Sequence, residues 1–106
     1  MDFKTEMDAY AEAAHDLVTM RAKFRADKEE QGLLEAKLWN EVLKDETLTN
    51  ERLRKIAFEK ASLDYTEYQD LLGAIQLQHD AIANREVDEQ FHLMWARYLT
   101  AVESSK

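Results

Sequence analysis

Residues 44–50 read K-D-E-T-L-T-N, and this short polar stretch separates two long runs of helical periodicity. Its Asp, Thr and Asn side chains compete for backbone hydrogen bonds, which favours turns and caps over a helix interior. The chain of 106 residues contains no proline and only two glycines, so little else interrupts a helix. We therefore predict that one long helix ends at this stretch and that further helix begins after it.

Upstream of this stretch, apolar residues recur every three or four positions. They are Phe3, Met7, Tyr10, Ala14, Leu17, Val18 and Phe24, followed by Leu34, Leu38, Val42 and Leu43. This spacing is typical of an amphipathic helix. Gly32 lies where the pattern weakens, but no proline or second glycine accompanies it. We predict one helix over residues 4–44.

Downstream, the pattern predicts a short helix over residues 50–61 and a long one over residues 65–102. Asp64 and Glu67 have the spacing of a capping box, which favours a helix start there. Gly73 lies inside the last helix, where we expect it to mark a close packing contact. His79 falls on the apolar stripe, so we expect a hydrogen-bonded core histidine rather than a metal ligand or a base.

The predicted fold is all-α: one domain, over residues 1–106, in which two long helices pair as an antiparallel, coiled-coil-like hairpin with a short helix at the elbow. Such a hairpin buries little apolar surface per residue, so we expect an oligomeric bundle. Near the C-terminus the apolar residues point in most directions around the helix, and the N-terminus of the hairpin lies beside them. The expected oligomer interface is Phe3, Met7, Tyr10, Phe91, Met94, Trp95, Tyr98 and Leu99.

The composition argues against several classes of function. The formal net charge is -8, from 22 acidic and 14 basic residues, which disfavours non-specific binding to nucleic acid. No run of about 20 apolar residues is present, and the N-terminus lacks the pattern of a signal peptide, so we expect a cytoplasmic protein without membrane contact. No residue has the context of a catalytic nucleophile, so we expect neither an enzyme nor a cofactor.

Basic residues gather just after the polar stretch, at Arg52, Arg54 and Lys55. Together with Asn50 they are candidates for contact with a nucleic acid or a partner protein. The alternative is structural: Thr49 and Asn50 cap the short helix, and the basic side chains pair with neighbouring glutamates. The sequence leaves both interpretations open.

Two E-x-x-H pairs, Glu12 with His15 and Glu89 with His92, place their side chains on one helix face each. Ferritin-like di-iron proteins use this unit on two of their four helices. If the hairpin turns near residue 52, the two pairs come level with one another. These four residues are the candidate metal ligands, although a full site would need carboxylates from a second chain.

The stretch from Leu48 to Leu72 resembles the middle of small helical proteins of tailed phages and prophages. The matching elements are Thr49-Asn50, Arg54-Lys55 and the Asp64, Tyr65 and Tyr68 that open the last helix. Many of those proteins have no assigned function, and some are encoded beside recombination genes. The resemblance implies an accessory to phage DNA metabolism, comparable to oligomeric recombination mediators, although the chain lacks the basic face expected of a protein that touches DNA.

We therefore expect a non-enzymatic helical protein that self-associates and acts through protein contacts, as an accessory to phage-type DNA recombination. One alternative is a ferritin-like di-metal protein assembled across a dimer. The other is an acidic phage inhibitor of a host nuclease, which needs no basic surface.

Overall fold

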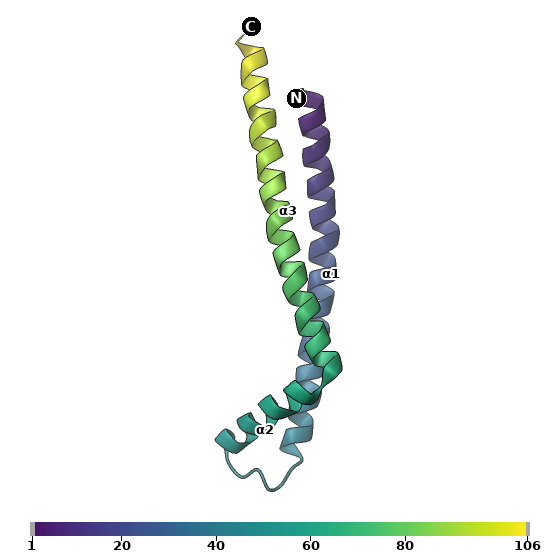
Figure 1. Cartoon of the computed structure of the whole chain (residues 1–106), viewed down its shortest axis with the longest axis vertical. Helices are drawn as coiled ribbons and strands as arrows, with labels where there is room; N and C mark the ends of the chain where they lie inside the picture. The colour runs from purple at the N-terminus through teal and green to yellow at the C-terminus, as the bar shows by residue number, and fades with distance from the viewer. Residues whose placement is uncertain (1, 106) are drawn as a thin grey trace. The chain divides into compact units, whose positions relative to one another are not determined.

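The computed structural model describes residues 2–105, which form three α-helices and no strand (Figure 1). Helix α1 spans Phe3–Leu43, α2 spans Glu51–Asp64 and α3 spans Thr66–Ser104. The all-α class and the short helix between two long ones are confirmed. The helix through Gly32 is also continuous, as predicted.

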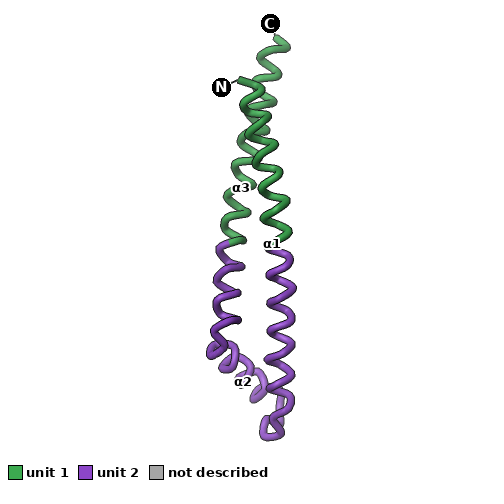
Figure 2. Tube along the Cα trace, turned by 90° about the vertical axis from the view of Figure 1, so that its right-hand side faces the viewer, with its two compact units in different colours: residues 1–23, 78–106 green, residues 24–77 purple. Residues whose placement is uncertain are grey.

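The chain divides into two compact units, coloured green and purple in Figure 2. Unit 1 comprises Met1–Lys23 and Gln78–Lys106, and unit 2 comprises Phe24–Leu77. In each unit, part of α1 lies beside part of α3 and runs in the opposite direction (Figure 2). The hairpin arrangement of the two long helices is therefore confirmed, whereas the single domain stays a prediction.

The core of unit 1 is narrow. Ala13 and Leu17 of α1 are 0% exposed, and Ala96 of α3 is 2% exposed. Two of these three residues are alanines, so little apolar area is removed from water here. Glu6, which is 2% exposed, is buried with them. Among the described residues it is the charged residue that is buried.

In unit 2 the core is formed by Leu38 and Val42 of α1 with Tyr68 and Ile75 of α3. Helix α2 contributes no buried residue. Its contact with α1 is an aromatic stack, in which the ring of Phe58 lies on Trp39 with a centroid distance of 4.3 Å. A docked surface helix of this kind depends on few contacts, so α2 belongs to the less stable part of the fold.

The polar stretch before α2 satisfies backbone groups, as its composition predicts. Asn50 is the N-cap of α2, and its side chain accepts a hydrogen bond of 2.9 Å from the Leu53 amide. Asp45 accepts hydrogen bonds from the hydroxyl and the amide of Thr47, and these lower the pKa of Asp45. Arg54 Nε donates to the Leu48 carbonyl at 3.1 Å. Side chains thus supply hydrogen bonds that no helix provides at this bend.

Two local predictions are wrong. Asp64 does not begin α3, because α2 continues through it and Tyr65 separates the two helices. The Tyr65 hydroxyl, rather than an aspartate cap, hydrogen-bonds Glu67 at 3.0 Å. Gly73 does not mark a close contact either, since a Cβ atom placed there would meet nothing within 4 Å.

Candidate functional site

The face of α3 that packs on α1 in unit 1 carries polar residues as well as Ala96. His92 Nδ1 lies 2.7 Å from Oε2 of the buried Glu6. Because an ionised carboxylate only accepts hydrogen bonds, Nδ1 is the donor. The side chain of His92 is 25% exposed and that of Glu6 only 3%. His92 is therefore the partner of a buried carboxylate.

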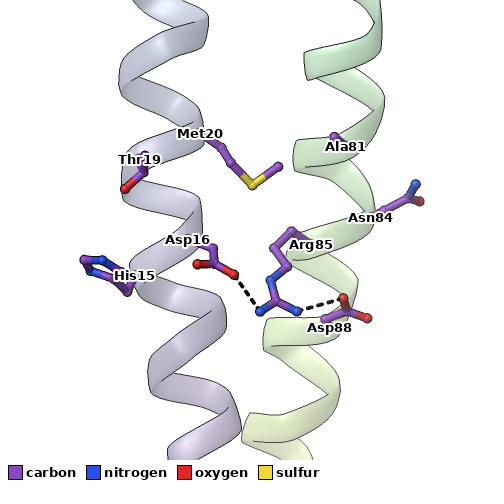
Figure 3. Close-up of a pocket in the computed structure, with 8 residues that line it drawn as sticks. All are labelled: His15, Asp16, Thr19, Met20, Ala81, Asn84, Arg85 and Asp88. Atoms are coloured by element: carbon purple, nitrogen blue, oxygen red, sulfur yellow. Dashed lines mark hydrogen bonds and ion pairs between the residues drawn. The ribbon is translucent and has the colours of Figure 1, made fainter.

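A second polar contact forms one part of an open groove of about 520 Å³ between α1 and α3 in unit 1 (Figure 3). Arg85 Nη2 donates to Asp16 at 2.8 Å, and Arg85 Nη1 donates to Asp88 at 3.2 Å. Both hydrogen bonds raise the pKa of Arg85, and the one with Asp16 has the larger effect. The guanidinium is therefore committed to two carboxylates, and the contact is a link between the helices rather than a free anion site.

The two predicted E-x-x-H pairs do not come together within the chain. His15 lies at the level of Arg85 and points away from α3 (Figure 3), whereas His92 faces Glu6. The contacts of Asp16 with Arg85 and of Glu6 with His92 place the two pairs at about the same level of the hairpin, as a turn near residue 52 predicts, so it is the direction of the side chains that keeps them apart. Among residues 2–105, no group of three or more His, Asp or Glu side chains is placed to hold a metal ion.

The opposite side of α3 in unit 1 is apolar and exposed. The exposed fractions are 68% for Val87, 42% for Phe91, 60% for Met94 and 57% for Tyr98. Because a helix turns by about 100° per residue, Met94 and the buried Ala96 point to nearly opposite sides. We call these four residues the outer face. They point away from α1. Phe91, Met94 and Tyr98 are among the residues that the sequence predicts for an oligomer interface.

Aromatic contacts connect two residues of the outer face through Trp95. The ring of Trp95 packs edge-on against Phe91, with centroids 6.2 Å apart, and against Tyr98, with centroids 5.4 Å apart. A shallow groove of about 530 Å³ runs along the same side of the helix. It is lined by Ala83, Glu86, Val87, Gln90, Phe91 and Met94. All of these residues belong to α3, so one helix alone provides a surface with both ridges and a hollow.

The predicted interface residues fall into three groups. Phe91, Met94 and Tyr98 lie on the outer face, and Trp95 and Leu99 are half-buried beside it. Phe3 and Met7 line a different groove, with Leu93, Ala96, Arg97 and Thr100. Tyr10 is half-buried. Val87 belongs to the outer face although it was not among the predicted interface residues, and its spacing of four residues from Phe91 was the signal for it.

The basic residues at the elbow do not act as one group. Arg54 is half-buried and engaged with the Leu48 carbonyl, and Asn50 is engaged as the cap. Arg52 and Lys55 are exposed. The predicted cap at Asn50 is thus present, whereas Arg54 binds a backbone carbonyl rather than a glutamate. Arg52 and Lys55 remain at the surface for a partner.

His79 is not a core residue. Its side chain is 67% exposed, and its Nδ1 lies 3.4 Å from the neighbouring Asp80. The apolar stripe that predicted burial fails here because Gln78, one position earlier, takes the less exposed place on the helix.

In unit 2, Glu35 accepts hydrogen bonds from the Tyr68 hydroxyl at 2.7 Å and from Gln31 Nε2 at 2.9 Å. The pKa of Tyr68 is raised above 10.0, mainly because the phenol is buried and to a smaller extent because it donates a hydrogen bond to Glu35. The neutral phenol therefore contributes stability below the unfolded-state pKa, and this contribution is lost as the pH rises through the higher folded-state pKa.

The raised pKa of Tyr68 predicts that the wild-type protein and Tyr68→Phe differ in their free energy of unfolding, and that this difference depends on pH. Below about pH 10, the variant should be less stable by about 1 kcal/mol, the usual net value of one hydrogen bond. Above that pH the difference should shrink, because only the wild-type unfolded state gains by ionising this tyrosine. Urea unfolding of both proteins between about pH 8 and 11 measures it. A difference that stays constant over this range would contradict the assigned environment of Tyr68.

No helix within residues 2–105 combines the length and the apolar character needed to cross a bilayer. Comparison with known proteins adds no relative: no protein-family model, no curated protein and no solved structure matches the chain.

Proposed function

We propose that this chain is a non-enzymatic helical interaction protein that self-associates through the outer face of α3. The observation that carries the proposal is the apolar, exposed stripe of Val87, Phe91, Met94 and Tyr98 on the side of α3 opposite to α1. Single exposed apolar residues are common on protein surfaces, but a contiguous row over three helical turns is typical of an interface.

The narrow core of unit 1 supports the same proposal. Its closely buried apolar residues are Ala13, Leu17 and Ala96, so this unit gains little from its own hydrophobic burial. Small cores of this kind usually need additional stabilisation, and oligomerisation is one common source. A second copy on the outer face would bury large aromatic and aliphatic side chains that the single chain leaves exposed.

The polar groups near the outer face favour a protein rather than a nucleic acid or an anionic membrane as the partner. Glu86 borders the groove, and the net charge of the whole chain is -8. Both phosphate backbones and anionic lipids need basic side chains around the contact. The resemblance of residues 48–72 to small phage proteins extends the proposal: the assembly would serve as an accessory in phage-type DNA recombination, acting through a partner protein.

Sedimentation velocity over a wide concentration range tests the self-association. The proposal predicts a discrete species of twice the mass of one chain that dissociates on dilution. A chain that sediments as a monomer at all concentrations up to about 100 μM, which corresponds to a very weak association, would refute self-association.

A further inference from the structure

The outer face carries both a projecting side chain and a hollow. Tyr98 is 57% exposed, and the groove of about 530 Å³ lies further back along the same helix. Ala83 and Val87 give the groove a small, apolar floor, and Glu86 and Gln90 supply polar groups beside it. Such a site fits a side chain with an apolar ring and a polar tip, as tyrosine has.

The chain cannot fill this groove with its own Tyr98. Val87 and Tyr98 stand about three turns apart on one continuous helix, which corresponds to about 16 Å. A second copy running in the opposite direction would bring its Tyr98 to the groove, and would receive the first copy's Tyr98 in return. In an isologous two-fold contact the same surface of each copy meets the other copy, so that surface must carry both the projecting side chain and the groove that receives it.

Building on the proposed self-association, we infer that two copies pair antiparallel through α3, with Tyr98 of each copy seated in the groove of the other. The two-fold axis lies between Phe91 and Met94. Val87 then faces the second copy's Tyr98, and Phe91 faces the second copy's Met94. We call each facing pair of side chains a layer. Val87, the smallest residue of the outer face, meets Tyr98, the largest, so every layer has a similar total volume, as close packing demands.

The alternative alignments are poorer. A parallel, in-register pair places Phe91 against Phe91 and Tyr98 against Tyr98, and leaves Val87 facing Val87 over unfilled grooves. An antiparallel pair shifted by one heptad in one direction brings Arg97 of both copies together. The opposite shift places Tyr98 against Asp80. Of the alignments compared, the axis between Phe91 and Met94 keeps all four layers apolar.

The area is sufficient for a second copy. The exposed parts of the four side chains amount to about 450 Å² per copy, given ordinary side-chain areas. The adjoining Ala83, Gln90, Arg97 and Ala101 enlarge the buried surface of the pair to about 1,200 Å², which is at the lower end of specific protein–protein interfaces. The contact therefore fits a reversible dimer.

Cysteine cross-linking tests the orientation cleanly because the chain contains no cysteine. In the inferred pair, residue 84 of one copy lies opposite residue 101 of the other, and both Asn84 and Ala101 are exposed in the single chain. We therefore expect Asn84→Cys mixed with Ala101→Cys to form a disulfide-linked dimer under diamide. Neither variant alone should do so, because like positions are about 25 Å apart along the helix.

Tyr98→Ala supplies the second readout. It should weaken dimerisation at least tenfold, as loss of a buried aromatic anchor does, while the variant stays helical by circular dichroism. Each cysteine variant cross-linking with itself, or a stable dimer in which the mixture does not cross-link, would overturn the antiparallel pairing but leave self-association intact. A monomer in sedimentation with no cross-link in any sample would overturn both proposals.

Discussion

Val87→Glu is expected to abolish self-association without unfolding the chain. Val87 is 68% exposed in the single chain, so a carboxylate there remains hydrated and the helix tolerates it. In the proposed dimer the same carboxylate would be covered by the second copy, once on each side. Burying an unpaired charge costs several kcal/mol, so the dissociation constant should rise at least 100-fold.

Val18→Glu is the matched control for this variant. Val18 lies on α1 in the same unit, is 67% exposed and undergoes the same change of charge. Sedimentation equilibrium at matched concentrations should therefore give a monomer for Val87→Glu and the wild-type mass for Val18→Glu. If the two variants behave alike, the outer face is not the contact, whatever the oligomeric state of the wild-type protein.

His92→Ala is expected to lower the free energy of unfolding by about 3 kcal/mol. The substitution removes the hydrogen-bond donor of Glu6, whose side chain is 3% exposed, and leaves a carboxylate buried without its partner. This value lies at the low end for a broken buried pair because the His92 ring itself is 25% exposed, which allows water to reach the site. Urea unfolding at one fixed protein concentration measures the loss.

The control is His79→Ala. His79 also lies near a carboxylate, that of Asp80, but its side chain is 67% exposed. Exposed pairs of this kind contribute between about 0 and 1 kcal/mol, so His79→Ala should unfold close to the wild-type midpoint. Equal losses in the two variants would mean that burial of Glu6 does not govern the pair, and would contradict the described core of unit 1.

The sequence was sufficient for the helices because their ends are encoded locally. Asn50 has the side chain that a helix N-cap requires, and the polar stretch at residues 44–50 contains the side chains that satisfy a bend. The failure at Asp64 has a physical cause as well. A capping box is a local motif, and Tyr65 with Glu67 offered the chain another hydrogen bond at the same place.

The orientation of each face was harder to predict, because both sides of α3 in unit 1 carry a helical pattern. The apolar row is exposed, and the row with Arg85, His92 and Ala96 packs on α1. Apolar periodicity alone does not say which row faces α1 and which faces another chain. Glu6 could have been found on α1, since it lies on the same helical face as Ala13 and Leu17, at spacings of about two and three turns.

Native mass spectrometry of the whole chain, purified without chelator, tests the central claim most directly because it reports stoichiometry and bound metal together. We predict a dimer whose mass is that of two chains alone. A monomer throughout the micromolar range would contradict it. A dimer that carries metal ions, which are lost when His15 and His92 are replaced by alanine, would also contradict it, in favour of a di-metal protein assembled across the two copies.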